Sequence, residues 1–255
     1  MSASADVRIA VVLAAGRGTR LGALTADTPK PLLTIGRRPL IAHILDGLIG
    51  AGIEQAAVIT GYHGAALEAE LGNGAGSGVA ITYLRQEALD GTARALALAR
   101  EVIGGQRFFF TWGDILVRPE NYRSVLRASR LADGAIAVNP MEDPSAGAAV
   151  FTEPPLPWPP TADMPAAVLT GIIEKPADGS TSHWNNAGFG VLGPEIFDVI
   201  ATLAPSPRGE YELTGALDAL VRAGTRIRAV PVEGPWFDIG TPESLDAARA
   251  AFITR

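Results

Sequence analysis

A glycine-rich loop with two cations is the part of this sequence whose residue types point most directly to chemistry. The segment LAAGRGTRLGALTADTPKPL (residues 13–32) follows an apolar run and contains Arg20 and Lys30. Gly16 and Gly18 allow the backbone to approach a ligand closely, because glycine has no side chain and accepts positive φ. Two fixed cations beside such a backbone suit a polyphosphate. The loop therefore predicts a phosphate-binding site.

Two widespread phosphate-binding patterns do not fit this loop. The P-loop requires a Lys-Ser or Lys-Thr pair after its glycines, and none follows here. The dinucleotide fingerprint requires glycine or alanine where this sequence has Leu21, and the next predicted strand lacks the ribose-binding acid. An NAD(P)-dependent oxidoreductase is therefore disfavoured, whereas a solvated basic loop with turn glycines stays open at this point.

Two acidic residues stand at strand ends that are far apart in the sequence. Asp114 follows the apolar segment FFFTWG, and Asp238 precedes the helix-start pattern Gly240-Thr241-Pro242. Mg²⁺ is typically held by one or two carboxylates, while substrate phosphate oxygens and water complete its octahedron. The pair fits that requirement, although each acid taken alone is equally typical of a turn.

The elements that must position these residues alternate in the first half of the sequence. Near-continuous apolar runs suit strands that are buried on both faces of a sheet. Their alternation with helices indicates an α/β fold with a doubly wound, mainly parallel sheet, and a ligand cleft at the carboxyl ends of the strands. The predicted strands are residues 8–13, 56–60, 79–84 and 107–112, and the predicted helices are residues 39–52 and 91–103.

The second half of the sequence has strands that are separated mainly by turns. Because no repeat or linker interrupts it, we expect one domain with two lobes. The proline-rich segment 153–165 predicts an extended surface connection between two strands. The predicted strands are residues 134–138, 148–151, 167–174, 187–192 and 226–232, and the predicted helices are residues 194–203, 212–224 and 242–252.

The composition excludes several classes of protein. A chain of 255 residues, 47% of them hydrophobic, suffices for one large domain. The absence of cysteine excludes disulfides, thiolate metal sites and cysteine nucleophiles. The net charge of −6 argues against a nucleic-acid surface, and no run approaches the roughly 20 apolar residues of a membrane span. We expect a cytoplasmic protein without nucleic-acid or membrane partners, and a homo-oligomer stays open.

The segments LAAGRGTRL and TPKPLL resemble the signature of the sugar-1-phosphate nucleotidyltransferases, also called nucleotide-sugar pyrophosphorylases. The resemblance covers nearly all of the chain and is nearest to glucose-1-phosphate thymidylyl- and uridylyltransferases and N-acetylmuramate-1-phosphate uridylyltransferases. It implies a Rossmann-like mixed sheet of the nucleotide-diphospho-sugar transferase type, Mg²⁺ dependence and pyrophosphate release. In a single domain of residues 1–255, residues 1–115 would form the nucleotide-binding lobe, residues 116–235 the sugar-phosphate-binding lobe, and residues 236–255 the segment with Asp238 and a closing helix.

The resemblance also implies roles around the nucleotide. Arg20 and Lys30 would hold the triphosphate, and Asp114 and Asp238 would bind Mg²⁺. Gln86 would read the Watson–Crick edge of the base, and Gly91 would leave room for its ring. The local pattern alone makes Gly91 a turn residue and Thr92 a helix cap. The implied nucleotide-binding set is Leu13, Ala14, Ala15, Gly16, Gly18, Thr19, Gln86, Gly91 and Thr92.

For the sugar phosphate, the resemblance implies contacts from three further segments. In IIEKPAD, Lys175 would contact the phosphate and Glu174 the sugar hydroxyls, while Asn186 of NNAGFGVL would contact the sugar and Gly147 would lie beneath it. Ala146 stands where an aromatic residue is frequent in the family, so the identity of the sugar stays open.

Together these patterns favour an enzyme that makes an NDP-sugar and pyrophosphate from a nucleoside triphosphate, UTP or dTTP in preference, and a sugar 1-phosphate. A guanylyl- or cytidylyltransferase remains an alternative. A catalytically silent regulatory relative is another, although it would be expected to lose catalytic groups and both acids and all three cations are present here. The tryptophans expected to serve in packing are Trp112, Trp184 and Trp236, and Trp236, which is close to Asp238, is also a candidate for the wall of the cleft.

Overall fold

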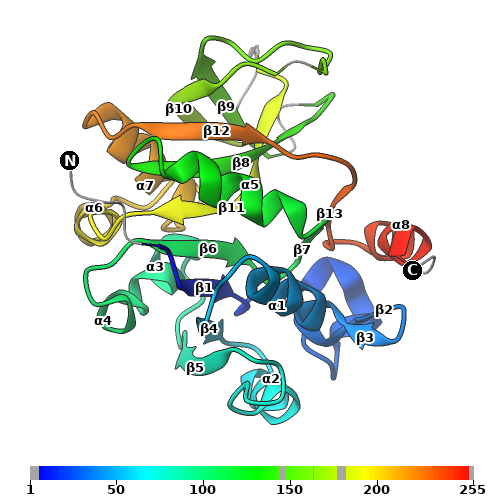
Figure 1. Cartoon of the computed structure of the whole chain (residues 1–255). Coiled ribbons are helices and arrows are strands. Elements are labelled where there is room, and N and C mark those ends of the chain that lie inside the picture. Colours follow the sequence, from blue (N-terminus) through cyan, green and yellow to red (C-terminus); the bar gives the residue numbers. More distant parts are fainter. Residues whose placement is uncertain (1–5, 144–146, 163, 177–181, 253–255) are drawn as a thin grey trace.

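The computed structural model describes residues 6–143, 147–162, 164–176 and 182–252. Its centre is one nine-stranded sheet in the order β5-β4-β1-β6-β11-β8-β12-β10-β9 (Figure 1). Two small sheets pair β2 (Thr34–Ile35) with β3 (Arg38–Pro39), and β7 (Ile115–Val117) with β13 (Trp236–Asp238). The large sheet consists of β1 (Ile9–Leu13), β4 (Gln55–Thr60), β5 (Ala80–Arg85), β6 (Phe108–Trp112), β8 (Gly134–Pro140), β9 (Ala148–Glu153), β10 (Ala167–Glu174), β11 (Trp184–Leu192) and β12 (Ile227–Pro231).

The strands β5, β4, β1 and β6 are all parallel. Parallel neighbours require crossover connections, and helices supply them between successive strands. Every residue of β1 is buried, as expected for a strand that is covered on both faces. The predicted helix 91–103 is interrupted at Leu98 and Ala99. The crossover helices are α1 (Leu40–Gly50), α2 (Gly64–Leu71), α3 (Thr92–Ala97) and α4 (Arg100–Ile103).

The other strands make the sheet mixed. β11 is antiparallel to both β6 and β8, while β12 is parallel to β8 and antiparallel to β10. β9 is antiparallel to β10 and also pairs with β11 through Ala149 and Asn185, so this end of the sheet curls back on itself. The mixed α/β fold expected from the sequence is confirmed.

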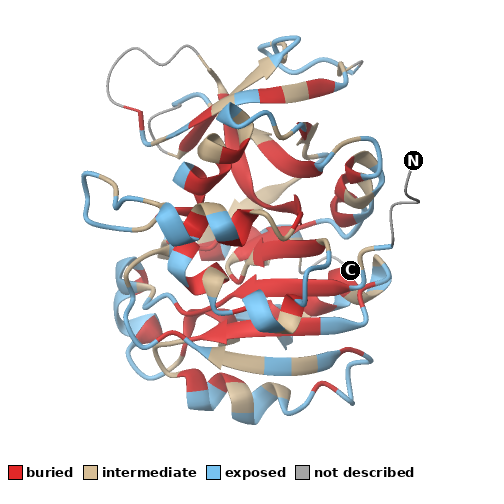
Figure 2. Cartoon of the chain, turned by 90° about the vertical axis from the view of Figure 1, so that its left-hand side faces the viewer, coloured by how far each residue is buried: buried red, intermediate tan, exposed pale blue. Residues whose placement is uncertain are grey.

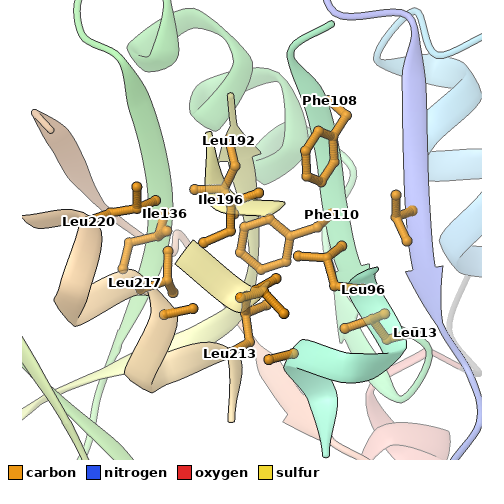
Figure 3. Close-up of a cluster of buried hydrophobic side chains, with 14 of the residues drawn as sticks. Leu13, Leu96, Phe108, Phe110, Ile136, Leu192, Ile196, Leu213, Leu217 and Leu220 are labelled. Carbon is orange, nitrogen blue, oxygen red and sulfur yellow. The ribbon is translucent and has the colours of Figure 1, made fainter. Parts of the chain in front are cut away.

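Helices cover both faces of the sheet, and the central strands are buried (Figure 2). Phe108 and Phe110 face one apolar cluster and Phe109 the other, because successive side chains of a strand alternate. The first cluster packs under α3, α6 (Ile196–Thr202) and α7 (Leu213–Arg222) (Figure 3). The second packs under α1 and α5 (Glu120–Ser129).

The remaining connections agree with the expectations where the structure describes them. Residues 154–162, between β9 and β10, contain no helix or strand, as the proline-rich composition predicted. The final helix, α8 (Pro242–Phe252), packs beside β2 and β13. Among the described residues, no helix combines the length and the apolar character that crossing a membrane requires.

Candidate active site

A cleft with a volume of about 360 Å³ opens at the carboxyl ends of β1, β5 and β6, where the sequence predicted it. The cleft has two walls of different construction. The strand-end wall is made by Leu13, Ala15, Gly16 and Gln86. The ion-pair wall, on the far side, is made by Glu174, Arg208, Glu212 and Thr214. Asp114 and Asp238 also line the cleft, as do Leu89, Gly91, Thr92, Ala95, Trp112 and Glu210.

The glycine-rich loop after β1 folds against itself. It forms the 3₁₀ segments η1 (Thr19–Thr25) and η2 (Lys30–Leu32). Gly18 has φ +65°, and a Cβ there would lie 3.3 Å from Cβ of Lys30, so a side chain would crowd the loop. Thr25 donates from Oγ1 to the Gly18 carbonyl at 3.0 Å. These contacts fix the path of the loop toward Lys30.

Lys30 joins the two acids that the sequence separated. Its Nζ lies 2.5 Å from Oδ2 of Asp114 and 3.8 Å from Oδ1 of Asp238. Pairing of β13 with β7 sets Asp238 opposite Ile115, and the Ile239 N–H donates to the Asp114 carbonyl at 3.0 Å. The side chain of Lys30 is only 9% exposed, so its charge depends on these carboxylates for stabilisation.

The electrostatics of Asp238 show that all three predicted cations act on one place. Burial, followed by the neighbouring Asp114 carboxylate, raises the pKa of Asp238 above its ordinary value, while Lys30, Arg20 and Lys175 oppose that rise. The guanidinium of Arg20 lies against Gly240, where a Cβ would be 2.7 Å from Nη2. Lys30 and Arg20 therefore lie beside the acids, and the charge of Lys175 is near enough to favour ionisation of Asp238.

The acidic pair fits a divalent cation. Oδ1 of Asp114 and Oδ1 of Asp238 are both buried and have no hydrogen-bond partner within the described residues. Those residues contain no group of three or more His, Cys, Asp or Glu side chains placed to hold a metal. Two buried carboxylate oxygens that accept no hydrogen bond from the described residues, beside an open cleft, suit Mg²⁺, which takes its other ligands from phosphate and water.

On the ion-pair wall, Glu174 is held from two sides. Its Oε2 accepts from Thr214 Oγ1 at 2.8 Å, and its Oε1 lies 3.4 Å from Nη2 of Arg208. Arg208 also donates from Nε to Oε1 of Glu212 at 3.0 Å. The hydrogen bond to Glu212 raises the pKa of Arg208 further. The wall therefore presents a cation that two carboxylates hold in place.

Lys175, Gly147 and Asn186 lie near β10 and β11 and are not among the residues that line the cleft. Lys175 has φ +41°, and its N–H donates to the Gly147 carbonyl at 2.9 Å. Asn186 accepts at Oδ1 from the Gly188 N–H at 3.0 Å, and its Nδ2 is buried without a partner in the described chain. Ala146 lies outside the described residues.

The loop after β5 holds the predicted base-reading residue. Gln86 is 8% exposed, and its Nε2 donates to Oδ1 of Asp90 and to the Gly91 carbonyl, each at 3.2 Å. Its Oε1 has no hydrogen-bond partner in the described chain and is therefore available as an acceptor. The amide group is thus oriented by the loop itself.

The structure adds a reason for glycine at position 91 and corrects the expected role of Thr92. A Cβ on Gly91 would lie 2.3 Å from the Tyr211 carbonyl oxygen, so the Tyr211 backbone requires glycine here, and the room for a base ring stays a prediction. Thr92 does not cap its own helix. Its Oγ1 accepts from the Leu213 N–H at 2.9 Å, at the start of α7. Both residues still line the cleft.

Several cleft residues escaped the sequence analysis. Arg208, Glu212 and Thr214 belong to SPRGEYELT, a charged stretch before an amphipathic helix, and this density of charge was the available signal. Trp112 was expected only to pack, yet it lines the cleft. Five of the predicted nucleotide-binding residues and triphosphate cations are not among the residues that line the cleft: Ala14, Gly18, Thr19, Arg20 and Lys30.

Comparisons with known proteins match nearly the whole chain. The family model described as nucleotidyl transferase matches residues 9–254. The chain is 34% identical over 242 residues to the UTP–glucose-1-phosphate uridylyltransferase AglF of Haloferax volcanii, covering 94% of each chain. It is 33% identical over 238 residues to a glucose-1-phosphate thymidylyltransferase of Mycolicibacterium smegmatis, covering 92% of this chain and 78% of that protein. Other relatives are longer, and the chain spans 54% of a bifunctional GlmU protein of Methanococcus maripaludis.

Solved structures show the same fold. A putative glucose-1-phosphate thymidylyltransferase of Bacillus anthracis has a TM-score of 0.83 and 27% identity, with 97% of this chain and 96% of that chain covered. A UDP-glucose pyrophosphorylase complexed with UDP-glucose also has a TM-score of 0.83, at 22% identity, and supports the fold alone. The resemblance noted in the sequence is confirmed, and the chain belongs to the sugar-1-phosphate nucleotidyltransferases of the nucleotidyl transferase family.

Proposed function

We propose that this protein transfers a nucleotidyl group from a nucleoside triphosphate, with UTP or dTTP preferred, to a sugar 1-phosphate. The products are an NDP-sugar and pyrophosphate. The observation that carries the proposal is the convergence of Lys30 on Asp114 and Asp238 at the edge of a cleft. The names of the relatives, a uridylyltransferase and thymidylyltransferases, support the choice of nucleotides and of sugar phosphate.

In the proposed reaction, an oxygen of the sugar phosphate attacks the α-phosphorus of the triphosphate. A new phosphorus–oxygen bond forms as the bond to the bridging oxygen of the departing pyrophosphate breaks. The attacking phosphate is already anionic near neutral pH, so the reaction needs no strong general base. The barrier lies in bringing two polyanions together, which makes positioning and charge stabilisation the work of the site.

The chain's own residues divide that work. Lys175 holds the attacking phosphate, while Lys30 and Arg20 hold the triphosphate and Arg20 stabilises the pyrophosphate as it leaves. Glu174, Asn186 and Gly147 contact the sugar.

Asp114 and Asp238 would hold Mg²⁺. Each has a buried carboxylate oxygen without a hydrogen-bond partner in the described chain, which supports this assignment. When bound, the ion supplies charge withdrawal from the α-phosphate.

Base recognition follows from the orientation of Gln86. Because its amide donors are used by Asp90 and Gly91, its free Oε1 accepts the imide N–H that uracil and thymine present. In this proposal, residues 1–115 bind the nucleotide, residues 116–235 bind the sugar phosphate, and residues 236–255 supply Asp238 and the closing helix α8.

A matrix of substrates tests the proposal. UTP, dTTP, GTP, CTP and ATP are each combined with the 1-phosphates of glucose, galactose, mannose and N-acetylglucosamine, and pyrophosphate release is measured with Mg²⁺ and with EDTA. We expect the highest kcat/KM with UTP or dTTP, and no release in EDTA. Preference for GTP or CTP would change the nucleotide assignment, and the absence of release with every pair would refute the reaction.

A further inference from the structure

The segment between α6 and α7 has little support of its own. Residues 203–212 contain no helix or strand, yet they carry Arg208 and Glu212 of the ion-pair wall. Within the segment, the Ser206 N–H donates to the Glu210 carbonyl at 2.8 Å. Outside the segment and α7, its hydrogen bonds within the described chain reach Ile200 of α6, Glu174, Asp90 of the loop before α3, and Ala93 of α3. Beyond its connections to α6 and α7, its position therefore depends on the contacts with Glu174 and with the start of α3.

The attachment to Asp90 and to the first turn of α3 centres on Tyr211. The Tyr211 N–H donates to the Asp90 carbonyl and the Tyr211 carbonyl accepts from the Ala93 N–H, both at 2.8 Å. The guanidinium of Arg94 lies 4.2 Å from the centre of the Tyr211 ring. We call these contacts, together with the bond from Leu213 N–H to Thr92 Oγ1, the Tyr211 seam.

The Tyr211 backbone can approach the loop before α3 closely because Gly91 has no side chain. Gly91 has φ +127°, and a Cβ there would lie 2.3 to 2.7 Å from three backbone atoms of Tyr211. The loop that orients Gln86 is thus in direct backbone contact with the segment that carries Arg208. The two walls of the cleft meet here, away from the metal-binding acids.

We propose that Tyr211 is a positioning residue, which holds Arg208 and Glu174 in register with the nucleotide-binding loop and so couples the two halves of the cleft. This inference rests on the proposed function. Its physical basis is that different kinds of contact hold the two walls of the cleft in place. The strand-end wall is fixed by β1 and β5, whereas the segment that carries Arg208 is fixed by the seam. Loosening the seam therefore displaces the sugar-phosphate side and leaves the nucleotide side in place.

Steady-state kinetics of Tyr211→Ala and Tyr211→Phe test the coupling. The Phe variant keeps the ring under Arg94, so it serves as the matched control. For Tyr211→Ala we expect KM for the sugar 1-phosphate to rise on the order of five- to tenfold, the size of a lost cation–π contact with its packing, while KM for UTP changes by less than about twofold. Equal rises in both KM values, or a Phe variant that matches the Ala variant, would overturn the proposal.

Arg94→Met removes the other partner of the cation–π contact with Tyr211. Because Arg94 is exposed, this substitution creates no cavity in the core. It should reproduce the KM pattern of Tyr211→Ala even if that variant folds poorly, and an unchanged sugar-phosphate KM would count against the seam.

A double-mutant cycle with Arg208→Met separates positioning from general loosening. If Tyr211 acts through Arg208, adding Tyr211→Ala to Arg208→Met raises KM for the sugar 1-phosphate by less than about twofold, because coupled residues are not additive. Full additivity would refute the positioning role. A wild-type protein without pyrophosphate release would instead refute the proposed function, so the two failures are distinguishable.

Discussion

The strand-end wall of the cleft is held by backbone at the ends of buried parallel strands, whereas the ion-pair wall is held by charged side chains that contact one another. Leu13 is the last residue of β1 in the sheet register, and the Ala15 carbonyl just beyond it accepts from the Tyr62 N–H at 3.3 Å. Glu174 ends β10, but its carboxylate is held by Arg208 and Thr214, and Arg208 owes its position to Glu174, to Glu212 and to the Tyr211 seam. A substitution in the strand-end wall should therefore change only the contacts of the substituted residue. A substitution in the ion-pair wall should also displace the side chains paired with that residue.

The largest effect is expected at the two acids that line the cleft beside the walls, Asp114 and Asp238. Asp238→Asn should lower kcat on the order of 10²- to 10³-fold, because it removes one of the two carboxylates proposed to hold Mg²⁺. The same variant should raise Tm of the metal-free protein near neutral pH, because the raised pKa of Asp238 shows that its ionised form is disfavoured in the folded state. The measurements are pyrophosphate release and thermal unfolding in EDTA.

The sign of the stability change follows from proton linkage. A carboxyl with a raised folded-state pKa binds its proton more tightly in the folded protein than in the unfolded chain. Stability therefore falls as pH rises through the interval between the two pKa values, and asparagine removes this loss. Asp246→Asn, an exposed acid on α8 paired with Arg249, is the matched control and should change neither measurement appreciably. A Tm in EDTA that is lower for Asp238→Asn than for the wild-type protein would contradict the raised pKa of Asp238.

An intermediate effect is expected at the cation assigned to the attacking phosphate. Lys175→Ala should raise KM for the sugar 1-phosphate about 10- to 100-fold, the range for losing a hydrogen bond to a charged group. KM for UTP should stay within about threefold, because the strand-end wall does not depend on Lys175. Initial rates with each substrate varied in turn measure both constants. Equal increases in KM for the sugar 1-phosphate and KM for UTP would show that Lys175 does not hold the attacking phosphate specifically.

The smallest effect, and the sharpest comparison of the walls, is expected from two glycines that both line the cleft. Gly91→Ala places a Cβ against the Tyr211 backbone at positive φ. It should cost about 1–3 kcal/mol of stability and raise KM for the sugar 1-phosphate severalfold. Gly16→Ala has open space around its Cβ, so it should leave stability unchanged and act only on the nucleotide. If both variants behaved alike in kinetics and unfolding, the distinction between the walls would fail.

Much of the strand-end half could be predicted from the sequence, because its signals are local. The apolar run at β1, the glycines after it and the acid after β6 each lie within a few residues of the feature they predict. Lys30, Asp114 and Asp238 were each identified from such local motifs. Their convergence depends on the pairing of β7 with β13, which no local pattern reveals.

The ion-pair wall could not be predicted in the same way. Arg208 and Thr214 act through Glu174, which lies on a different element of the fold. Gly91 shows the same limit: its sequence context indicates a turn, but the reason for glycine is the backbone of Tyr211, which arrives from the far half of the chain. Non-local contacts of this kind carry no periodicity or spacing signal.

The strand order has a consequence for how the chain reaches this structure. β11 lies between β6 and β8, and both neighbours of β8, namely β11 and β12, come later in the chain. During synthesis, the early strands β1, β4, β5 and β6 can pair with one another soon after they are made. In contrast, both backbone edges of β8 stay unpaired until β11 and β12 have been made. Long-range pairing slows folding, and unpaired edges expose a nascent chain to misassociation. The cleft is therefore completed last, when the second half of the chain adds Glu174 and the rest of the ion-pair wall to a half that is already in place.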